Sequence, residues 1–453
     1  MRGGAAPEAV LSYLSRAMTY DLELQAARRQ EIAARMEREG GGVMLLPAGD
    51  EKIRNADSEF LFRQDSDFAY ATGFDEPTGC ALLFADGRYV LFVRPKDPER
   101  EIWTGRRAGI EGAKAEYGAT EAYPASEVDA KMPGLLDRAG TLWFRFGHDA
   151  AWDLRVGRAL CDLRARARTG VVAPQRFLDP GLVLHEMRLF KSEQELRALR
   201  KAAEITAEAH LSAMRDGLPG RREFQVQAEI EYAFRRRGGT GPGYGTIVAA
   251  GPNSTILHYR AGDAPLADGD VCLVDAGGEY AFYTADVTRT FPVSGSFTKA
   301  QREAYEVVLA AQLEGIAAVK PGATVDGVHD VVVRRLTEGM LKLGLLQGAV
   351  DERLADNSYR RYYMHRTSHW LGMDVHDVGA YYVNGKSRTL ERGMVLTVEP
   401  GLYVAADDAA APEALRGVGI RIEDDILVTA DGHVNLTEAT PKAPDEVEAC
   451  CVR

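Results

Sequence analysis

Cysteine is scarce in this chain, and the few that occur do not form a disulfide pattern. Five cysteines stand in 453 residues, no C-x-x-C pair occurs, and Cys450 and Cys451 are adjacent near the C-terminus. A disulfide framework is therefore excluded, and we expect reduced thiols in a cytoplasmic protein.

Long apolar runs and an excess of positive charge are also missing. No stretch approaches the ~18 apolar residues that a membrane helix needs, and the first residues lack the basic start and apolar core of a signal peptide. Lys and Arg number 55 against 67 Asp and Glu, which gives a net charge of −12. We therefore expect neither a membrane nor a nucleic acid as partner, because an acidic chain repels phosphate.

What is present is the composition of a folded protein, with 45% apolar and 27% charged residues. The length predicts two or three domains. We expect an extension over residues 1–20, an α/β domain over 21–190 and an α+β domain over 191–453. The second boundary precedes Ser192, where S-x-x-E forms a capping box before a helical apolar period.

Apolar periodicity gives the expected elements. Residues 21–38 predict an amphipathic helix, 43–46 a buried strand, and 80–84 with 89–93 a hairpin around Asp86-Gly87. In the second domain, helices are expected from 192 and over 222–236, 298–318 and 324–343, and strands over 271–275, 280–291, 394–398 and 419–429.

Five segments of the second domain each place a metal-type ligand on or beside a strand. These ligands are Asp275, Asp286, His369, Glu399 and Glu423. Burying several unpaired carboxylates costs many kcal/mol, so they must be exposed, protonated, paired or neutralised by metal. Two divalent cations balance four carboxylates, whereas the single Arg421 cannot. Oxygen ligands with one imidazole favour Mn²⁺, with Zn²⁺, Co²⁺ or Fe²⁺ also possible.

Each of these residues also has an ordinary explanation. A single Asp or Glu is more often a turn residue, a strand-end charge or a surface partner, and a single histidine is more often hydrogen-bonded structure. The metal-centre hypothesis depends on all five occurring together. No H-E-x-x-H motif is present, so a mononuclear zinc protease of that type is not indicated.

Six ordered segments of the second domain resemble the signature of the Xaa-Pro aminopeptidases (aminopeptidase P), in the family that also holds prolidase and methionine aminopeptidase. They are Leu257–Tyr259, Val274–Gly277, Ala285–Pro292, Ser368–Asp377, Thr397–Tyr403 and Gly419–Asp425. The resemblance continues upstream at His185–Ser192, Ser66–Phe68 and Thr72–Phe74. It implies a pita-bread catalytic domain, in which two pseudo-symmetric αβ halves enclose a two-metal centre.

The resemblance also implies roles for the ligands. Asp275 would bind one metal, His369 and Glu399 the other, and Asp286 and Glu423 would bridge both. The expected reaction is attack by a metal-bridging hydroxide on the carbonyl before proline, with Glu399 moving the proton. His365 and His376 are the candidates for stabilising the oxyanion.

Substrate contacts are expected from further residues. His258 is expected on the proline side of the pocket, and Tyr403 and Arg421 are expected to hold Glu423 or Asp275. Trp103 matches the family pattern and is either an aromatic that reaches a neighbouring subunit or a core or interface residue. The family suggests a homo-oligomer, dimer or tetramer.

The expected substrates are peptides with proline in the second position, whose scissile bond lacks the N–H that extended-backbone proteases grip. Two alternatives remain open. A prolidase would keep the same metal centre but cleave only dipeptides, and a catalytically inactive binding relative would have lost metal ligands.

Overall fold

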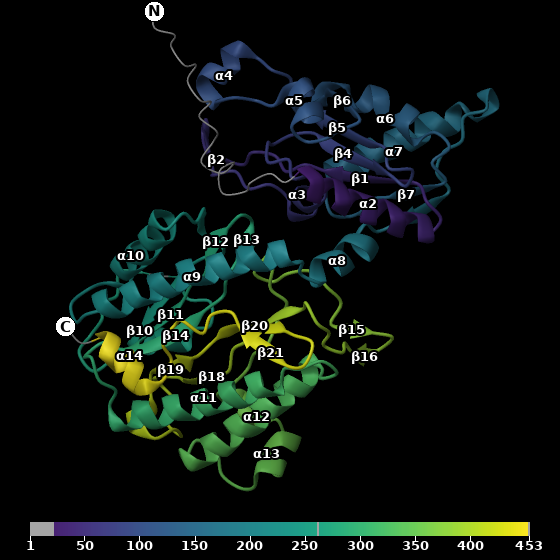
Figure 1. The fold of residues 1–453 in the computed structure, drawn as a ribbon. Helices are drawn as coiled ribbons and strands as arrows, with labels where there is room; N and C mark the ends of the chain where they lie inside the picture. Colours follow the sequence, from purple (N-terminus) through teal and green to yellow (C-terminus); the bar gives the residue numbers. More distant parts are fainter. Residues whose placement is uncertain (1–21, 261, 452–453) are drawn as a thin grey trace, which may run out of the picture. The chain divides into compact units, whose positions relative to one another are not determined.

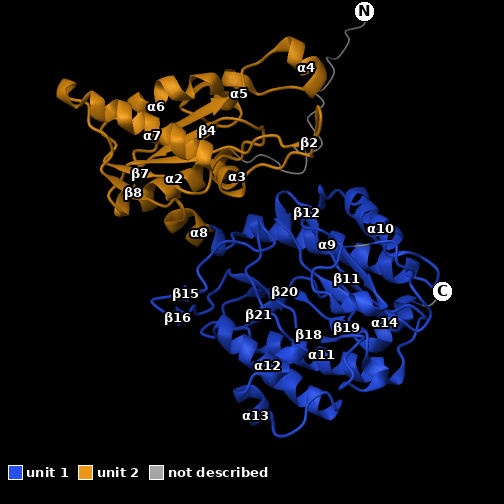
Figure 2. Ribbon diagram, turned by 180° about the vertical axis from the view of Figure 1, so that it is seen from behind, with its two compact units in different colours: residues 1–18, 188–453 blue, residues 19–187 orange. Residues whose placement is uncertain are grey.

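The computed structural model describes residues 22–260 and 262–451, so the predicted extension over 1–20 lies outside the described residues. The chain divides into two compact units, whose described parts lie within residues 19–187 and 188–453 (Figure 2). Among the described residues, no helix combines the length and the apolar character needed to cross a bilayer.

The first unit is built on one mixed six-stranded sheet in the order β6-β5-β4-β1-β7-β8. Its strands are β1 (Val43–Pro47), β4 (Cys80–Phe84), β5 (Tyr89–Val93), β6 (Glu121–Pro124), β7 (Thr141–Trp143) and β8 (Arg176–Leu178), with a small β2 (Ile53–Asn55) and β3 (Ser58–Glu59) pair apart. The predicted hairpin is confirmed, because β4 and β5 pair antiparallel. The central strands are apolar on both faces, and they are buried along their whole length except at Pro47.

Helices accompany this sheet (Figure 1). They are α2 (Leu22–Arg38), α3 (Ser66–Thr72), α4 (Pro98–Thr104), α5 (Gly109–Ala115), α6 (Val128–Leu136), α7 (Ala150–Ala165) and α8 (Gly181–Leu189). The amphipathic helix expected over 21–38 is confirmed as α2, which buries Ile32 and Met36. Trp103 lies in α4 on the surface of this unit, with 86% of its area exposed. The prediction that it could be a core residue is therefore wrong.

The second unit has two halves that share one core. The first half holds β9 (Gly241–Pro242), β10 (Ile247–Ala250), β11 (Val271–Asp275), β12 (Gly278–Tyr280), β13 (Tyr283–Thr284) and β14 (Thr288–Pro292), with α9 (Glu193–Asp216) and α10 (Glu223–Arg236). The second half holds β15 (Tyr382–Val383), β16 (Lys386–Ser387), β17 (Val395–Val398), β18 (Gly401–Val404), β19 (Val418–Arg421), β20 (Asp424–Val428) and β21 (His433–Asn435), with α11 (Lys299–Ala318), α12 (Val325–Lys342) and α13 (Val350–Ala355); α14 (Pro444–Cys451) follows.

Figure 1 shows the strands of this unit between α9 with α10 on one side and α11 with α12 on the other. The helix starts agree with the sequence: Ser192 and Thr298 form capping boxes and Thr324 caps α12. A single apolar cluster extends from Ile205 of α9 through β11 to Ile420 of β19. The two halves are therefore held around one interior.

Two predicted strands are wrong as continuous elements. Residues 280–291 form β12, β13 and β14 with breaks between them, and residues 419–429 are divided into β19 and β20. The breaks arise because the chain changes sheets: β13 pairs with β12 but β14 pairs with β11, and β19 pairs with β18 but β20 pairs with β17. Asp286 and Glu423 lie at these two changes.

Candidate metal centre

The four candidate carboxylates share one structural position, the point where a strand leaves one sheet for another. Asp275 is the last residue of β11, before the chain joins β12 in the second sheet. Asp286 lies between β13 and β14, Glu399 between β17 and β18, and Glu423 between β19 and β20. Each half thus supplies two carboxylates from a pair of adjacent crossings.

The two carboxylates of the first half share one hydrogen-bond donor. The hydroxyl of Tyr244 lies 2.6 Å from Asp275 Oδ1 and 2.5 Å from Asp286 Oδ1. Asp275 is the cross-strand partner of Thr288 rather than of Asp286, so the turn brings the side chains together without direct pairing. Gly277 permits this, because a Cβ there would lie 1.7 Å from the Ala285 carbonyl oxygen.

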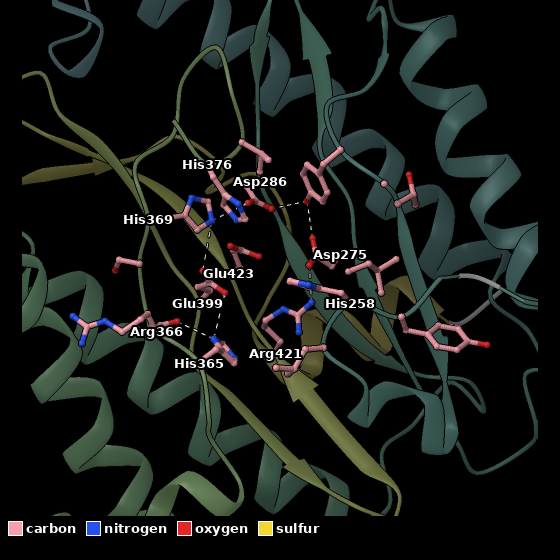
Figure 3. A pocket seen from close by; sticks show the side chains of 18 of the residues that line it. His258, Asp275, Asp286, His365, Arg366, His369, His376, Glu399, Arg421 and Glu423 are labelled. Atoms are coloured by element: carbon pink, nitrogen blue, oxygen red, sulfur yellow. Dashed lines mark hydrogen bonds and ion pairs between the residues drawn. The ribbon is translucent and has the colours of Figure 1, made fainter. Parts of the chain in front are cut away.

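His369 connects the two halves. Its Nε2 lies 3.3 Å from Asp286 Oδ2 and 3.6 Å from Glu399 Oε1, and Figure 3 shows these groups pointing toward one another with Glu423. Ligand atoms of Asp286, His369 and Glu423 lie within 4.8 Å of one another. The backbone at His369 is held against β17, since the N–H of Thr397 donates to the His369 carbonyl at 3.0 Å.

Arg421 pairs with one carboxylate of the cluster, Asp275, and it also contacts His365 through the hydroxyl of Tyr403. Its Nη2 donates to Asp275 Oδ2 at 2.6 Å and its Nη1 donates to the Tyr403 hydroxyl at 3.0 Å. That hydroxyl lies 2.8 Å from His365 Nε2, and His365 Nδ1 lies 2.8 Å from the Arg366 carbonyl. Both nitrogens of His365 are therefore engaged. Tyr403 contacts Arg421 and His365, not Glu423 or Asp275 directly.

His376 is brought beside His369 by a short loop, with ring centroids 4.5 Å apart. Asp377, the residue after His376, anchors this loop. It accepts from Arg188 Nη2 at 2.6 Å and from Lys191 Nζ at 3.1 Å. These ion-pair side chains are almost fully buried. Gly372 is required under the loop, because a Cβ there would lie 2.1 Å from Asp377 Oδ2.

Burial and mutual repulsion raise the pKa values of Glu399 and Glu423 strongly. Burial raises the pKa of Glu399 to about 7. Burial and the charges of Asp286 and Glu399 raise the pKa of Glu423 well above its ordinary value. Burial alone would lower the pKa of His369, but its hydrogen bond to Asp286 and the charge of Glu399 outweigh burial and raise it to about 9. The imidazolium thus occupies the place of a cation among acids.

The other pocket histidines behave in the opposite way. Burial, helped by the charge of Arg421, lowers the pKa of His365 to about 3. Burial and the proximity of His369 lower the pKa of His376. Both rings are therefore neutral near pH 7.

The site residues predicted from the sequence, apart from Tyr403, line one cavity of about 1150 Å³. Its wall includes Asp275, Asp286, His369, Glu399 and Glu423, together with His258, His365, His376 and Arg421. His258 lies on the side of Asp275 and Arg421 (Figure 3). The structure therefore brings the sequence-predicted residues together, with Tyr403 directly behind His365.

The donor set fits divalent metal ions. Four carboxylates and one imidazole converge in an interior where carboxyl pKa values are raised by burial, and a cation would relieve that cost. Arg421 offsets one negative charge only, through Asp275. Oxygen-rich sites with one histidine suit divalent ions of the first transition row.

Comparison with known protein families agrees with this chemistry. The model of metallopeptidase family M24 matches residues 197–430, and that of the aminopeptidase P N-terminal domain matches residues 25–143. This chain belongs to metallopeptidase family M24. It is therefore a hydrolase of the metallopeptidase type, with the aminopeptidase P arrangement of an N-terminal domain before the catalytic one.

Relatives within the M24 family match over almost the whole chain. The Xaa-Pro aminopeptidase of Escherichia coli is 46% identical over 94% of this chain and 96% of its own length. That of Haemophilus influenzae is 40% identical over 97% and 98%. The solved structure of Pseudomonas aeruginosa aminopeptidase PepP has a TM-score of 0.93 at 45% identity, covering 95% and 98% of the two chains. The pita-bread architecture expected from the resemblance is confirmed.

Sequence reasoning missed three residues that support the M24 ligands. Tyr244 lies in a glycine-rich segment, and its hydroxyl contacts two carboxylates. Thr288 donates to Glu423 Oε2 at 2.6 Å, and Asp425 accepts from the Asp286 N–H at 3.1 Å. A bulky aromatic among glycines was the available signal for Tyr244.

Proposed function

We propose that this chain is an Xaa-Pro aminopeptidase, which releases the N-terminal residue from peptides with proline in the second position. The observation that carries the proposal is the convergence on a single cavity of four carboxylates, each at a sheet crossing, and one imidazole. Support comes from relatives called Xaa-Pro aminopeptidase that match along nearly the full chain.

The proposed cofactor is a pair of divalent ions, with Mn²⁺ favoured by the oxygen-rich ligand set. Asp275 would hold one ion, His369 and Glu399 the other, and Asp286 and Glu423 would contact both. Such ions make water nucleophilic near neutral pH and polarise the scissile carbonyl.

Glu399 is proposed to move the proton. Its carboxylate lines the cavity beside His369, where it can take a proton from water and pass it to the proline nitrogen of the leaving peptide. His365 lies beside it, with Nδ1 3.7 Å from Glu399 Oε2. Both nitrogens of His365 are engaged by the Arg366 carbonyl and the Tyr403 hydroxyl, so His365 is not our candidate for the oxyanion.

His376 is proposed to stabilise the oxyanion. Its ring is neutral near pH 7 and lines the cavity beside His369, so an N–H can donate to the carbonyl oxygen as negative charge develops. His258, on the opposite side, is proposed to contact the proline residue, and Arg421 with Tyr403 to order Asp275 and His365.

Hydrolysis of matched peptides tests this function. The purified chain, with Mn²⁺ added, should release the first residue from X-Pro-Y-Z peptides and leave X-Ala-Y-Z peptides intact. Cleavage of the X-Pro dipeptide alone would show a prolidase instead. No bound metal and no hydrolysis would indicate an inactive binding relative.

We also propose a reduced, cytoplasmic setting and a homo-oligomer. All five cysteines are free thiols, and Cys161 is exposed, which suits a reducing compartment. The exposed Trp103 is available for contact with another subunit. Sedimentation of the purified chain would measure the subunit number, for which we propose a dimer or tetramer.

A further inference from the structure

A buried carboxylate outside the metal centre holds the segment that carries His258. Glu223 is the first residue of α10 and has no exposed area. The connection from β10 to β11 passes around it, and residues 257–260 of this connection line the cavity. We call the described part of residues 251–262 the His258 loop.

Glu223 accepts four hydrogen bonds, all from the His258 loop or the strand residue before it. Its Oε1 accepts from the Ala250 N–H at 3.0 Å and from Asn253 Nδ2 at 2.9 Å. Its Oε2 accepts from the Tyr259 hydroxyl at 2.7 Å and from the Gly262 N–H at 3.2 Å. One carboxylate thus ties together the beginning, middle and end of the loop.

Hydrogen-bond donors, and no positively charged side chain of the described residues, surround this carboxylate. Within residues 22–260 and 262–451, no Lys or Arg side chain lies at ion-pair distance from Glu223. A buried anion without a cation is tolerable only with good hydrogen bonds, and hydrogen bonds to a charged acceptor are about twice as strong as neutral ones. All four partners donate, and three of them are N–H groups that cannot accept, so a glutamine would turn its own N–H₂ toward at least one N–H.

The position of His258 depends on this tie. In the part of the chain that the structure describes, no hydrogen bond holds the His258 ring, whose side chain is exposed to the cavity. The backbone of the loop must therefore set where the imidazole lies. Tyr259, the next residue, is the one whose hydroxyl binds Glu223.

We propose that Glu223 is a positioning residue that fixes the His258 loop, and with it the fit of the proline side of the substrate. The proposal rests on the proposed aminopeptidase function. Glu223 contacts none of the five proposed metal ligands. Its loss should therefore weaken substrate binding while the metal centre and the chemical step remain intact.

Two variants and one matched control test the tie. Tyr259→Phe removes one donor and keeps the anion, and Glu223→Gln removes the anion. Tyr305→Phe is the control, because Tyr305 is buried in the same unit and its hydroxyl donates to the Lys442 carbonyl at 2.9 Å. We expect KM for an X-Pro-Y peptide to rise about tenfold in the two loop variants, with kcat and metal content unchanged. Tyr305→Phe should leave KM unchanged.

Limited proteolysis gives a readout that does not use the activity. Arg260 is exposed within the loop, so trypsin should cut after it several-fold faster in Tyr259→Phe and Glu223→Gln than in Tyr305→Phe. Equal cutting rates in all three would overturn the tie. Faster cutting with an unchanged KM would overturn the positioning role.

A double substitution separates positioning from general damage. In a His258→Ala background, Glu223→Gln should raise KM no further, because the group it positions is gone. An equal tenfold rise in both backgrounds would contradict the proposal. If Glu223→Gln fails to fold, Tyr259→Phe carries the same comparison. If the wild-type chain cleaves no X-Pro peptide, the proposed function and the KM effect fall together, and trypsin still decides whether the tie exists.

Discussion

The metal centre differs from an ordinary protein interior because several acidic side chains are buried close together. Asp286 and Glu423 are 4% and 2% exposed, and they face each other with Glu399 across the cavity. Burial raises the pKa of all three carboxyls. Such a cluster stores electrostatic free energy that a cation can release, so a single ligand should have a large effect.

Replacement of Asp286 by Ala tests the ligand set directly. Asp286 is proposed to contact both ions, so we expect loss of at least one ion and a fall in kcat/KM beyond ~100-fold, the upper end for residues that only support ligands. Metal content by mass spectrometry and X-Pro-Y hydrolysis measure the two effects. Asp268→Ala is the control, since Asp268 is an exposed carboxylate in the connection before β11. A variant that kept two ions and full activity would contradict the ligand assignment.

At this scale the sequence predicted the charged ligands and missed their neutral partners. Asp275 and Glu399 stand at the end of apolar runs, where a carboxylate is conspicuous. Tyr244 and Thr288 are ordinary residues in turns and strands. Only the three-dimensional structure shows the Tyr244 hydroxyl on two proposed ligands and the Thr288 hydroxyl on one. Hydroxyl contacts depend on sheet crossings that periodicity does not encode.

Among the elements, the turn after β11 depends on a glycine for space rather than for backbone angle. A Cβ on Gly277 would lie 1.7 Å from the Ala285 carbonyl oxygen, so Gly277→Ala must separate the two crossings that carry Asp275 and Asp286. We expect a loss of stability of ~1–3 kcal/mol, together with weaker metal binding. Thermal unfolding and metal titration measure these effects. Gly432→Ala is the control, because nothing lies within 4 Å of its added Cβ, and an equally small effect of Gly277→Ala would be the contrary result.

Helix α9 is joined to the same turn by a buried histidine with a pH-dependent cost. His210 Nε2 lies 3.0 Å from the Ala276 carbonyl oxygen, and burial lowers the pKa of His210 to about 4. Between pH 6.5 and 4 the unfolded chain therefore binds a proton that the folded chain does not, and stability falls as the pH falls.

Substitution of this histidine should flatten that pH dependence. The free energy of unfolding of His210→Gln should lose less on acidification from pH 6.5 to 4, by up to ~1.4 kcal/mol per pH unit. Urea unfolding at pH 4.5, 5.5 and 6.5 measures the slope. His148→Gln is the comparison, because His148 is exposed in the first unit. Parallel slopes for wild type and His210→Gln would refute the assignment.

The sequence was enough to predict that a helix or strand exists in these segments, but not whether a strand is continuous. The capping box at Ser192 located the start of α9, because a serine oxygen and a glutamate three residues later satisfy the free N–H groups. The runs over 280–291 and 419–429 are rich in aromatic and β-branched residues and look like single strands, although each contains charged residues. Their division follows from pairing with two different sheets, which is a long-range property.

For the whole molecule, the protonation of the centre is linked to the stability of the fold. Without metal, Glu399 and His369 have pKa values of about 7 and 9, both above the values of an unfolded chain, near 4.3 and 6.5. The metal-free fold then holds protons that the unfolded chain releases. These two groups therefore stabilise the metal-free fold at low pH. The contribution of Glu399 is lost as the pH rises through about 7, and that of His369 as it rises through about 9.

Metal ions remove this dependence because they take the place of those protons. The gap in Tm between the Mn²⁺-loaded and the chelator-treated, desalted protein should therefore widen from pH 5 to pH 8. His329 should titrate equally in both forms and cancel from the gap, because burial and the charges of Arg366, Asp326 and Arg360 set its pKa. Each kcal/mol corresponds to ~2–4 °C for a unit of this size, so we expect several degrees. Calorimetry at fixed free Mn²⁺ measures it, and a gap that stayed constant or narrowed with rising pH would show that the protons do not occupy the metal positions.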